Sequence, residues 1–142
     1  MRWAKRSLLA LAAMMIISPV LAEEMVVCTP EYYYNSSETP PVIVPIDAAR
    51  AAGSRVTRID LETGDYAEHF IGSDSDILRT GSLTVVNPGS LRERIDFVAL
   101  DPATALLLHI SLIDEGLPFV RVDEEGTVAS GHCRYASDMV QK

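Results

Sequence analysis

The residues of this chain that could do chemistry are two cysteines, a run of three tyrosines and three histidines. Cys28 and Cys133 are 105 residues apart and could form a disulfide or remain free thiols. A nucleophilic thiol needs a base and a lowered pKa, and nothing near Cys28 in the sequence supplies them. A disulfide closing a loop of this length stabilises a fold by roughly 4–5 kcal/mol in the chain-entropy model. We therefore expect the two cysteines to be bonded.

Tyr32, Tyr33 and Tyr34 form the cluster that we single out for ligand or partner binding. Alternation along a strand sends two of them to one face and one to the other, and a polar segment follows at once. Exposed tyrosines provide a large amphipathic contact area at a low cost in side-chain entropy. The alternative is that they are ordinary strand aromatics that fill one end of a barrel.

The histidines, His69, His109 and His132, do not form the pattern of a metal centre. Zinc needs three or four ligands that converge on one point. His132 and Cys133 are adjacent on an expected strand, so their side chains leave it on opposite faces. We expect three solvent-facing histidines and neither a metal nor a cofactor. The chain also lacks the signatures of nucleophile elbows, zinc proteases, Walker loops and dinucleotide sites, so no catalytic residue is predicted.

The first 22 residues have the layout of a secretory signal peptide. Three cations lie within the first six residues, residues 7–22 are uncharged and mostly apolar, and Val20 and Ala22 occupy the positions of a small-residue cleavage site. The alternative is an uncleaved anchor, but an uncharged stretch of 16 residues is shorter than the roughly 20 that span a bilayer. We expect a periplasmic or extracellular bacterial protein, with residues 23–142 as one domain and no membrane span after cleavage.

Composition limits the classes of partner. The chain carries 12 Lys+Arg and 20 Asp+Glu, a net charge of −8, and 48% of its residues are hydrophobic. Removal of residues 1–22 leaves nine cations against 20 acids, a formal charge of −11. Nucleic-acid binding needs cations that displace counterions from phosphates, so it is not expected. The expected partner is a small ligand or a basic protein.

Hydrophobic residues recur mostly with a period of two, which predicts an all-β domain. Turn sequences recur about every 10–14 residues, so we expect an antiparallel meander of seven to nine strands with one short helix near 47–52. A bond between Cys28 and Cys133 would join neighbouring strands in an up-and-down barrel. A closed or nearly closed barrel is therefore favoured, with a β-sandwich as the alternative.

Three local predictions accompany this meander. Residues 77–86 should form one strand bent at Gly81, and 87–90 should form a type II turn around Pro88-Gly89. Along 105–113, alternate residues should point into the barrel. These inward residues are Leu106, Leu108, Ile110 and Leu112.

The layout of signal peptide, early cysteine, β-meander and late cysteine resembles small exported calycin-like barrels. Periplasmic inhibitors of lysozyme have a comparable plan. Ser130-Gly131 followed by Tyr135 is similar to their Ser-Gly-x-x-Tyr signature with one extra residue, so no functional residue is carried over. The sequence thus predicts an exported, non-enzymatic binding or interaction module. A protein inhibitor of a cell-wall hydrolase, or an enzyme without a recognisable motif, is the alternative.

The exported protein should begin at Glu23 and show no tryptophan fluorescence, because Trp3 is the only tryptophan in the chain. N-terminal sequencing and an emission spectrum of protein recovered from the periplasm check this. A start within residues 1–22, or emission from tryptophan, would show that the segment is retained.

Overall fold

The computed structural model describes residues 25–35, 42–51, 53–73, 76–90 and 95–139, and the predicted signal peptide lies outside these ranges. Ten strands form one antiparallel sheet. The strands are β1 (Met25–Asn35), β2 (Val42–Pro45), β3 (Arg55–Asp60), β4 (Asp65–Phe70), β5 (Ile77–Ser82), β6 (Thr84–Ser90), β7 (Ile95–Asp101), β8 (Leu106–Ile110), β9 (Pro118–Val122) and β10 (Val128–Tyr135). Two short helical turns accompany them, α1 (Ala48–Ala51) and the 3-10 turn η2 (Ala136–Met139).

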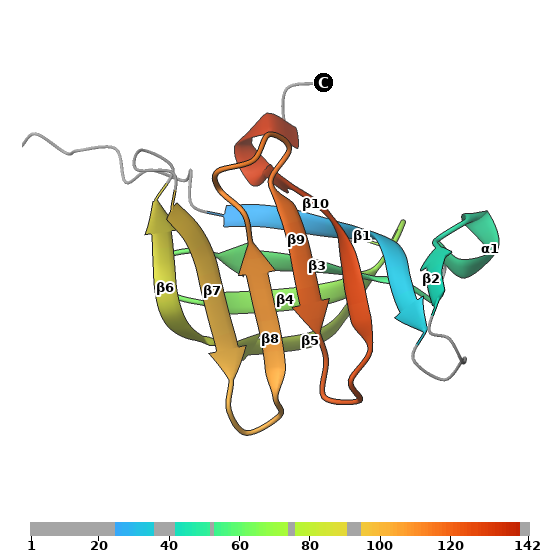
Figure 1. Ribbon diagram of the computed structural model, residues 1–142, viewed down its shortest axis with the longest axis horizontal. Helices are drawn as coiled ribbons and strands as arrows, with labels where there is room; N and C mark the ends of the chain where they lie inside the picture. The colour runs from blue at the N-terminus through green and yellow to red at the C-terminus, as the bar shows by residue number, and fades with distance from the viewer. Residues whose placement is uncertain (1–24, 36–41, 52, 74–75, 91–94, 140–142) are drawn as a thin grey trace, which may run out of the picture.

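The strand order confirms the predicted barrel (Figure 1). The order is β5-β4-β3-β1-β10-β9-β8-β7-β6, with β2 paired to β1 outside this path of nine strands. The first strand lies between β3 and the last strand, β10. The two ends of the path, β5 and β6, are consecutive in the chain and are joined through Leu83. The barrel is thus nearly closed: the path of hydrogen-bonded strands runs from β5 to β6, and these two end strands are connected by the chain without pairing to each other.

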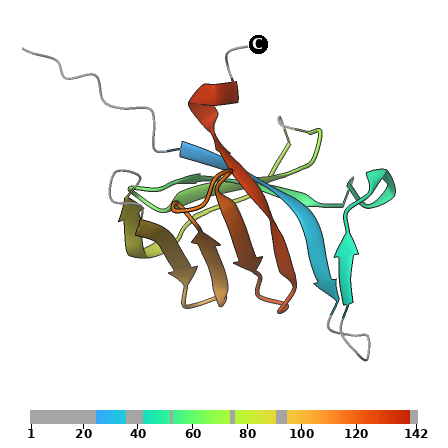
Figure 2. The ribbon, with the colours of Figure 1, turned by 45° about the horizontal axis from the view of Figure 1, so that its top comes forward.

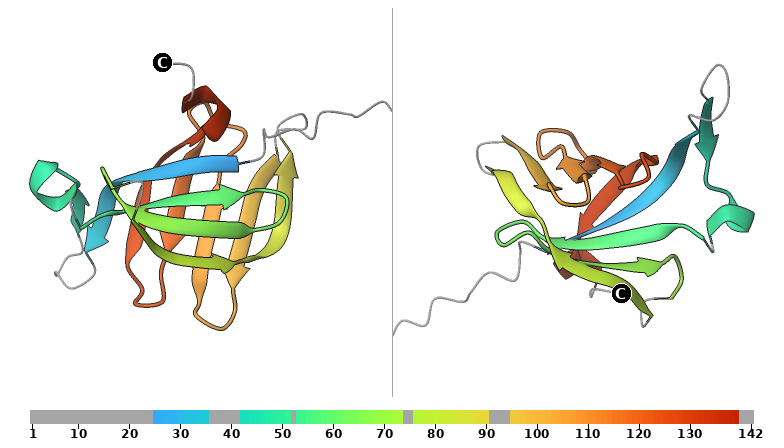
Figure 3. Two further views of the ribbon diagram at one scale, coloured as in Figure 1. Left: turned by 180° about the vertical axis from the view of Figure 1, so that it is seen from behind. Right: turned by 90° about the horizontal axis from the view of Figure 1, so that it is seen from below.

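The barrel is built from two layers whose strands cross, which the views from the front, from a tilted angle and from behind all show (Figures 1, 2 and 3). Strands β3–β5 form one layer, and β6–β10 run across them in the other. Orthogonal layers need corners where a strand passes from one layer to the next. One corner lies at Leu83, which is buried and whose backbone N–H donates to the carbonyl of Gly64 at 2.9 Å.

This corner corrects the prediction of one strand over 77–86 bent at Gly81. The chain instead divides at Leu83 into β5 and β6, which belong to different layers. Gly81 still has a packing role, because a Cβ there would meet the ring of Tyr66. The bend therefore falls where an apolar side chain can be buried between the layers.

The predicted type II turn at 87–90 is also wrong. Asn87 and Pro88 lie in β6 and pair with Val98 and Phe97 of β7, after an irregularity in register that follows Val85. Proline is tolerated here because β6 is the end strand of the sheet, where one side of the backbone needs no partner. The connection to β7 runs through 91–94, outside the described residues.

The predicted helix near 47–52 is confirmed as the single turn α1. The side chain of Asp47 accepts a hydrogen bond from the backbone N–H of Arg50 at 3.1 Å. An aspartate at this position satisfies a backbone donor that a short helix leaves unpaired. The turn leads directly into β3 and places Ser54 at the entrance of the barrel.

The predicted disulfide between Cys28 and Cys133 is confirmed. The two residues are directly opposite each other in the β1–β10 pair, with Cα atoms 3.9 Å apart, and both are buried. Two positions away, a Cβ on Gly131 would collide with the carbonyl of Thr29. The small residues of β10 therefore permit the close approach of β1.

The predicted inward stripe is confirmed, because Leu106, Leu108 and Ile110 of β8 and Leu112 just after it are all buried. Leu107 and His109 alternate with them and are partly exposed. The core that these residues join consists of Val26, Cys28, Ile59, Leu61, Tyr66, Leu83, Phe97, Ala99, Leu106, Leu108, Ile110, Leu112, Phe119 and Cys133. The middle of the barrel is thus filled by side chains from both layers.

Leu108→Ala should lower the free energy of unfolding by about 2–5 kcal/mol, because it leaves a cavity in this core. Leu107→Ala on the same strand makes the same chemical change on the outer face and should cost less than half as much. Denaturant unfolding of both variants measures this. Equal losses would mean that the assigned register of β8 is wrong.

Candidate functional site

A pair of buried charges lies inside the barrel, beyond the apolar core. Glu68 of β4 has no exposed side-chain surface, and the side chain of Arg121 on β9 is only 8% exposed. Strand alternation places them there, because Glu68 shares a face with Tyr66 and Arg121 shares a face with Phe119. The inward rows of β4 and β9 therefore pass from apolar to charged.

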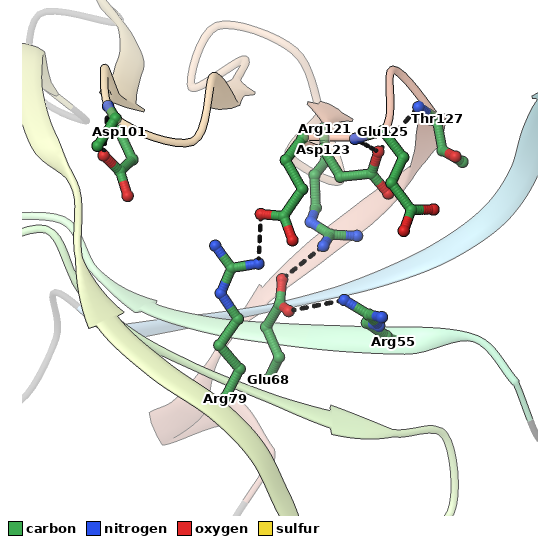
Figure 4. A network of polar contacts seen from close by, with 10 residues as sticks. Arg55, Glu68, Arg79, Asp101, Arg121, Asp123, Glu125 and Thr127 are labelled. Carbon is green, nitrogen blue, oxygen red and sulfur yellow. Dashed lines mark hydrogen bonds and ion pairs between the residues drawn. The ribbon is translucent and has the colours of Figure 1, made fainter.

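The two layers are joined through the carboxylate of Glu68 (Figure 4). Arg121 Nη2 lies 2.7 Å from Glu68 Oε1, and Arg55 Nη1 of β3 lies 3.6 Å from Glu68 Oε2. The side chain of Arg55 is 44% exposed, so its guanidinium also reaches solvent. This trio carries two positive charges and one negative charge. The attraction between two buried charges offsets the free-energy cost of removing them from water only when the charges are in close contact.

A second ion pair crosses the same gap nearer to solvent. Arg79 of β5 donates to Glu124 in the β9–β10 turn at 2.9 Å, and its guanidinium carbon lies 5.8 Å from the centroid of the Tyr66 ring. On the adjacent β7–β8 turn, a hydrogen bond from the backbone N–H of Ala103 lowers the pKa of Asp101. Charged side chains therefore surround the end of the barrel that the β9–β10 turn marks.

A pocket of about 230 Å³ opens at this end, and we call it the mouth pocket. It exists because Ala129 of β10 is paired with Tyr33 on one side and with Arg121 on the other, so a methyl group lies between two long side chains. The hydroxyl of Tyr33 donates to Ser54 Oγ at 2.7 Å, which fixes the ring as a wall. The lining residues are Pro30, Tyr33, Gly53, Arg55, Arg121, Asp123, Thr127 and Ala129.

The tyrosine run borders two hollows, the mouth pocket and a groove on the outside of the barrel. Tyr33 faces the mouth pocket, while Tyr32 and Tyr34 are exposed on the outside, at 44% and 41%. All three tyrosines border a groove with Ile43, Val120, Val128 and Ser130. The side chains that the sequence singled out therefore share this groove, and Tyr33 also lines the mouth pocket.

Tyr32 and Tyr34 belong to a wider surface, which we call the outer apolar face. The strand registers align two rows of outward residues across β2, β1, β10, β9, β8 and β7. One row is Ile43, Tyr34, Val128, Val122, Leu107 and Leu100; the other is Pro45, Tyr32, Ser130, Val120, His109 and Val98. Ten of these twelve residues are apolar or aromatic.

Acidic turns border the outer apolar face at both ends of its strands. The β9–β10 turn contains Asp123, Glu124 and Glu125, and the β8–β9 loop contains Asp114 and Glu115. Neither segment, 111–117 or 123–127, contains lysine or arginine. The net charge expected from composition is therefore concentrated in part at the edges of an apolar surface.

The expectation of three solvent-facing histidines is wrong for His69, which is buried and has Nδ1 3.0 Å from the carbonyl oxygen of Phe70. On the outer surface, His109 Nε2 lies 2.9 Å from Asp96, and this contact lowers the pKa of that carboxyl. His132 Nδ1 lies 2.8 Å from Glu31. Among the residues that the structure describes, no three His, Cys, Asp or Glu side chains gather as a metal site.

The buried pair of Glu68 and Arg121 was missed in the sequence, although a signal was present. Residues two positions apart in a strand share a face. Glu68 therefore lies on the same face as Tyr66 in β4, and Arg121 lies on the same face as Phe119 in β9. This places an acidic and a basic side chain on the inward faces of two strands. Only the fold shows that the two faces meet.

Within the described ranges, no helix is long and apolar enough to cross a bilayer.

Comparisons with protein families, with curated proteins and with solved structures find no match for this chain.

Glu68→Gln should lower the free energy of unfolding by about 3–5 kcal/mol, because it leaves the Arg121 guanidinium buried without a full counter-charge. Arg121→Met should also destabilise the fold. The double variant should cost at least about 1 kcal/mol less than the sum of the two single changes, because the residues are in contact. Chemical denaturation of the four proteins measures this coupling, and strictly additive losses would contradict the ion pair.

Proposed function

We propose that this protein is an exported, non-enzymatic interaction module that binds a basic protein partner through its outer apolar face. The observation that carries the proposal is the alignment of two apolar rows across six neighbouring strands. Outward positions of a sheet in contact with water are usually polar. Five of the twelve residues are exposed and the other seven are partly exposed, and a contiguous apolar surface of this kind is typical of an interaction site.

One end of this face, where β2, β1 and β10 pair, carries two exposed tyrosines, a residue type that often dominates binding energy at protein interfaces. Tyr34 pairs with Ile43 on one side and Val128 on the other, and Ile43 is 70% exposed. At a protein interface, smaller neighbouring side chains exclude water from around a large side chain. The large side chain then contributes most of the binding energy. These residues are already held in position by pairing on both sides of β1, so little backbone ordering is needed on binding.

The charge at the border of the face selects the partner. The acidic turns at Asp114–Glu115 and Asp123–Glu125 would repel an acidic protein and attract one with basic residues around an apolar centre. The net charge of −8 of the whole chain adds to this attraction over longer distances. A basic cell-wall hydrolase has these properties, so inhibition of such an enzyme is one specific form of the proposal.

A large apolar ligand inside the barrel is less well supported. Phe97, Leu108 and Ile110 are completely or almost completely buried within one continuous core. A barrel that holds such a ligand keeps its interior open. The pocket found at the mouth is smaller than the roughly 300–1,000 Å³ of ordinary ligand sites and is lined partly by charges.

Photocross-linking tests the outer apolar face directly. A photoreactive phenylalanine analogue at Val120 should form an adduct with a basic protein in the producing bacterium. The same analogue at Thr80, exposed on β5 in the other layer, should not. The partner is identified by mass spectrometry. Equal adducts from both positions, an acidic partner or an adduct with a second copy of this chain would contradict the proposal.

The affinity for the captured partner should then depend on the face and on salt. Ile43→Ser should weaken binding by about tenfold, whereas Ile77→Ser makes the same change at an isoleucine 62% exposed on β5 and should have less than a twofold effect. Higher ionic strength should weaken binding further.

A separate assay with lysozyme as the basic probe tests the inhibitor form of the proposal. The protein should reduce hydrolysis of cell wall by lysozyme, and the Ile43→Ser variant should no longer reduce it.

A further inference from the structure

We infer that the mouth pocket binds a small organic carboxylate, held by the guanidinium groups of Arg121 and Arg55. This site is separate from the outer apolar face, because Tyr33, Ala129 and Arg121 point inward where their chain neighbours point outward. The inference therefore does not rest on the proposed function, and either can fail alone.

The donors of the pocket come from two layers of the barrel. Arg121 lines the pocket from β9, and its Nε is buried without a hydrogen-bond acceptor among the described residues. Arg55 lines it from β3, and its contact with Glu68 is an ion pair at 3.6 Å, longer than a hydrogen bond. Planar guanidinium groups present paired N–H donors that match the two oxygens of a carboxylate.

The acidic groups around the pocket leave these donors available to a ligand. Glu68 offsets one of the two positive charges beneath the pocket. Glu124 is paired with Arg79. Asp123 lies in the wall, but its Oδ1 accepts hydrogen bonds from the backbone N–H groups of Glu125 and Thr127 and so holds the β9–β10 turn. A ligand carboxylate would supply the acceptors that the buried arginine lacks.

The remaining wall is apolar and limits the size of the ligand. Pro30 and Ala129 are buried, and Tyr33 is held by its hydrogen bond to Ser54. A volume of about 230 Å³ fits a carboxylate with a short hydrocarbon chain. The pocket thus combines charged donors at one side with an apolar surface for the chain of the ligand.

The net negative charge of the protein does not exclude such a ligand. At an ionic strength of 0.15 M, charges separated by more than about 8 Å are largely screened at the surface. Partly buried charges at short range are screened much less. Arg55 and Arg121 carry two positive charges, against one negative charge each on Glu68 and on Asp123 in the wall. These four charges balance, so the guanidinium N–H donors at short range, and not a net charge, attract the carboxylate.

Calorimetric titration of the full exported protein with butanoate tests the inference, with butanamide and inorganic phosphate as companions at equal ionic strength. Butanoate should bind saturably with one site, and its binding should shift the NMR signals of the side-chain N–H groups of Arg55 and Arg121. The neutral amide, which has the same shape, should bind at least tenfold more weakly. Equal binding of the amide, or binding of phosphate alone, would overturn the inference.

Arg55→Gln should weaken butanoate binding by tenfold or more while leaving the 2.7 Å pair of Arg121 and Glu68 in place. Arg134→Gln is the matched control, because Arg134 is exposed on β10 outside this pocket and its replacement removes the same charge. The Arg134→Gln change should alter the affinity for butanoate by less than twofold. Equal losses of affinity in the two variants would mean that net charge, and not the pocket, attracts the ligand. Circular dichroism verifies that both variants are folded.

Discussion

The barrel depends on the antiparallel pairing of β1 with β10. All other neighbours on the main path except β1 and β3 are joined by a short segment of chain, so this contact alone brings the first and last strands together. Closing so long a loop costs entropy, which grows slowly with loop length. The Cys28–Cys133 disulfide reduces that cost by constraining the unfolded chain, and Gly131 provides the space in which the two backbones approach.

This closure makes a chamber between crossed layers, and the inward rows fill it unequally. Toward one end the rows consist of buried aliphatic and aromatic side chains. Toward the β9–β10 turn they contain Glu68 and Arg121, which cannot be buried separately without a large desolvation cost. Their contact links β4 with β9 across the layers, and the neighbouring alanine, Ala129, leaves room beside them. The same charges that join the layers thus also define a small polar pocket.

The outer surface follows from the same strands seen from the other side. A sheet that faces water on one side would normally carry polar side chains there. Across β2, β1 and β7–β10 the outward residues are instead mostly apolar, with acids concentrated in the turns. Stability of the isolated barrel does not require this distribution, because the core is already complete inside. Recognition of a partner is a sufficient physical reason for it.

Much of this architecture is encoded locally. Alternation with a period of two identified the strands and the inward stripe of β8, Asp47 identified the start of α1, and the cysteine positions predicted the closing pair. The same alternation separated Tyr33 from Tyr32 and Tyr34. It could not locate the corner at Leu83 or the continuation of β6 through Pro88, because both depend on which layer the following strand joins. Nor could it show that Glu68 faces Arg121, that the outward rows of six strands align, or that Ala129 leaves a pocket. Each of these is a contact between residues distant in the chain, and only the register and crossing of the strands determine it.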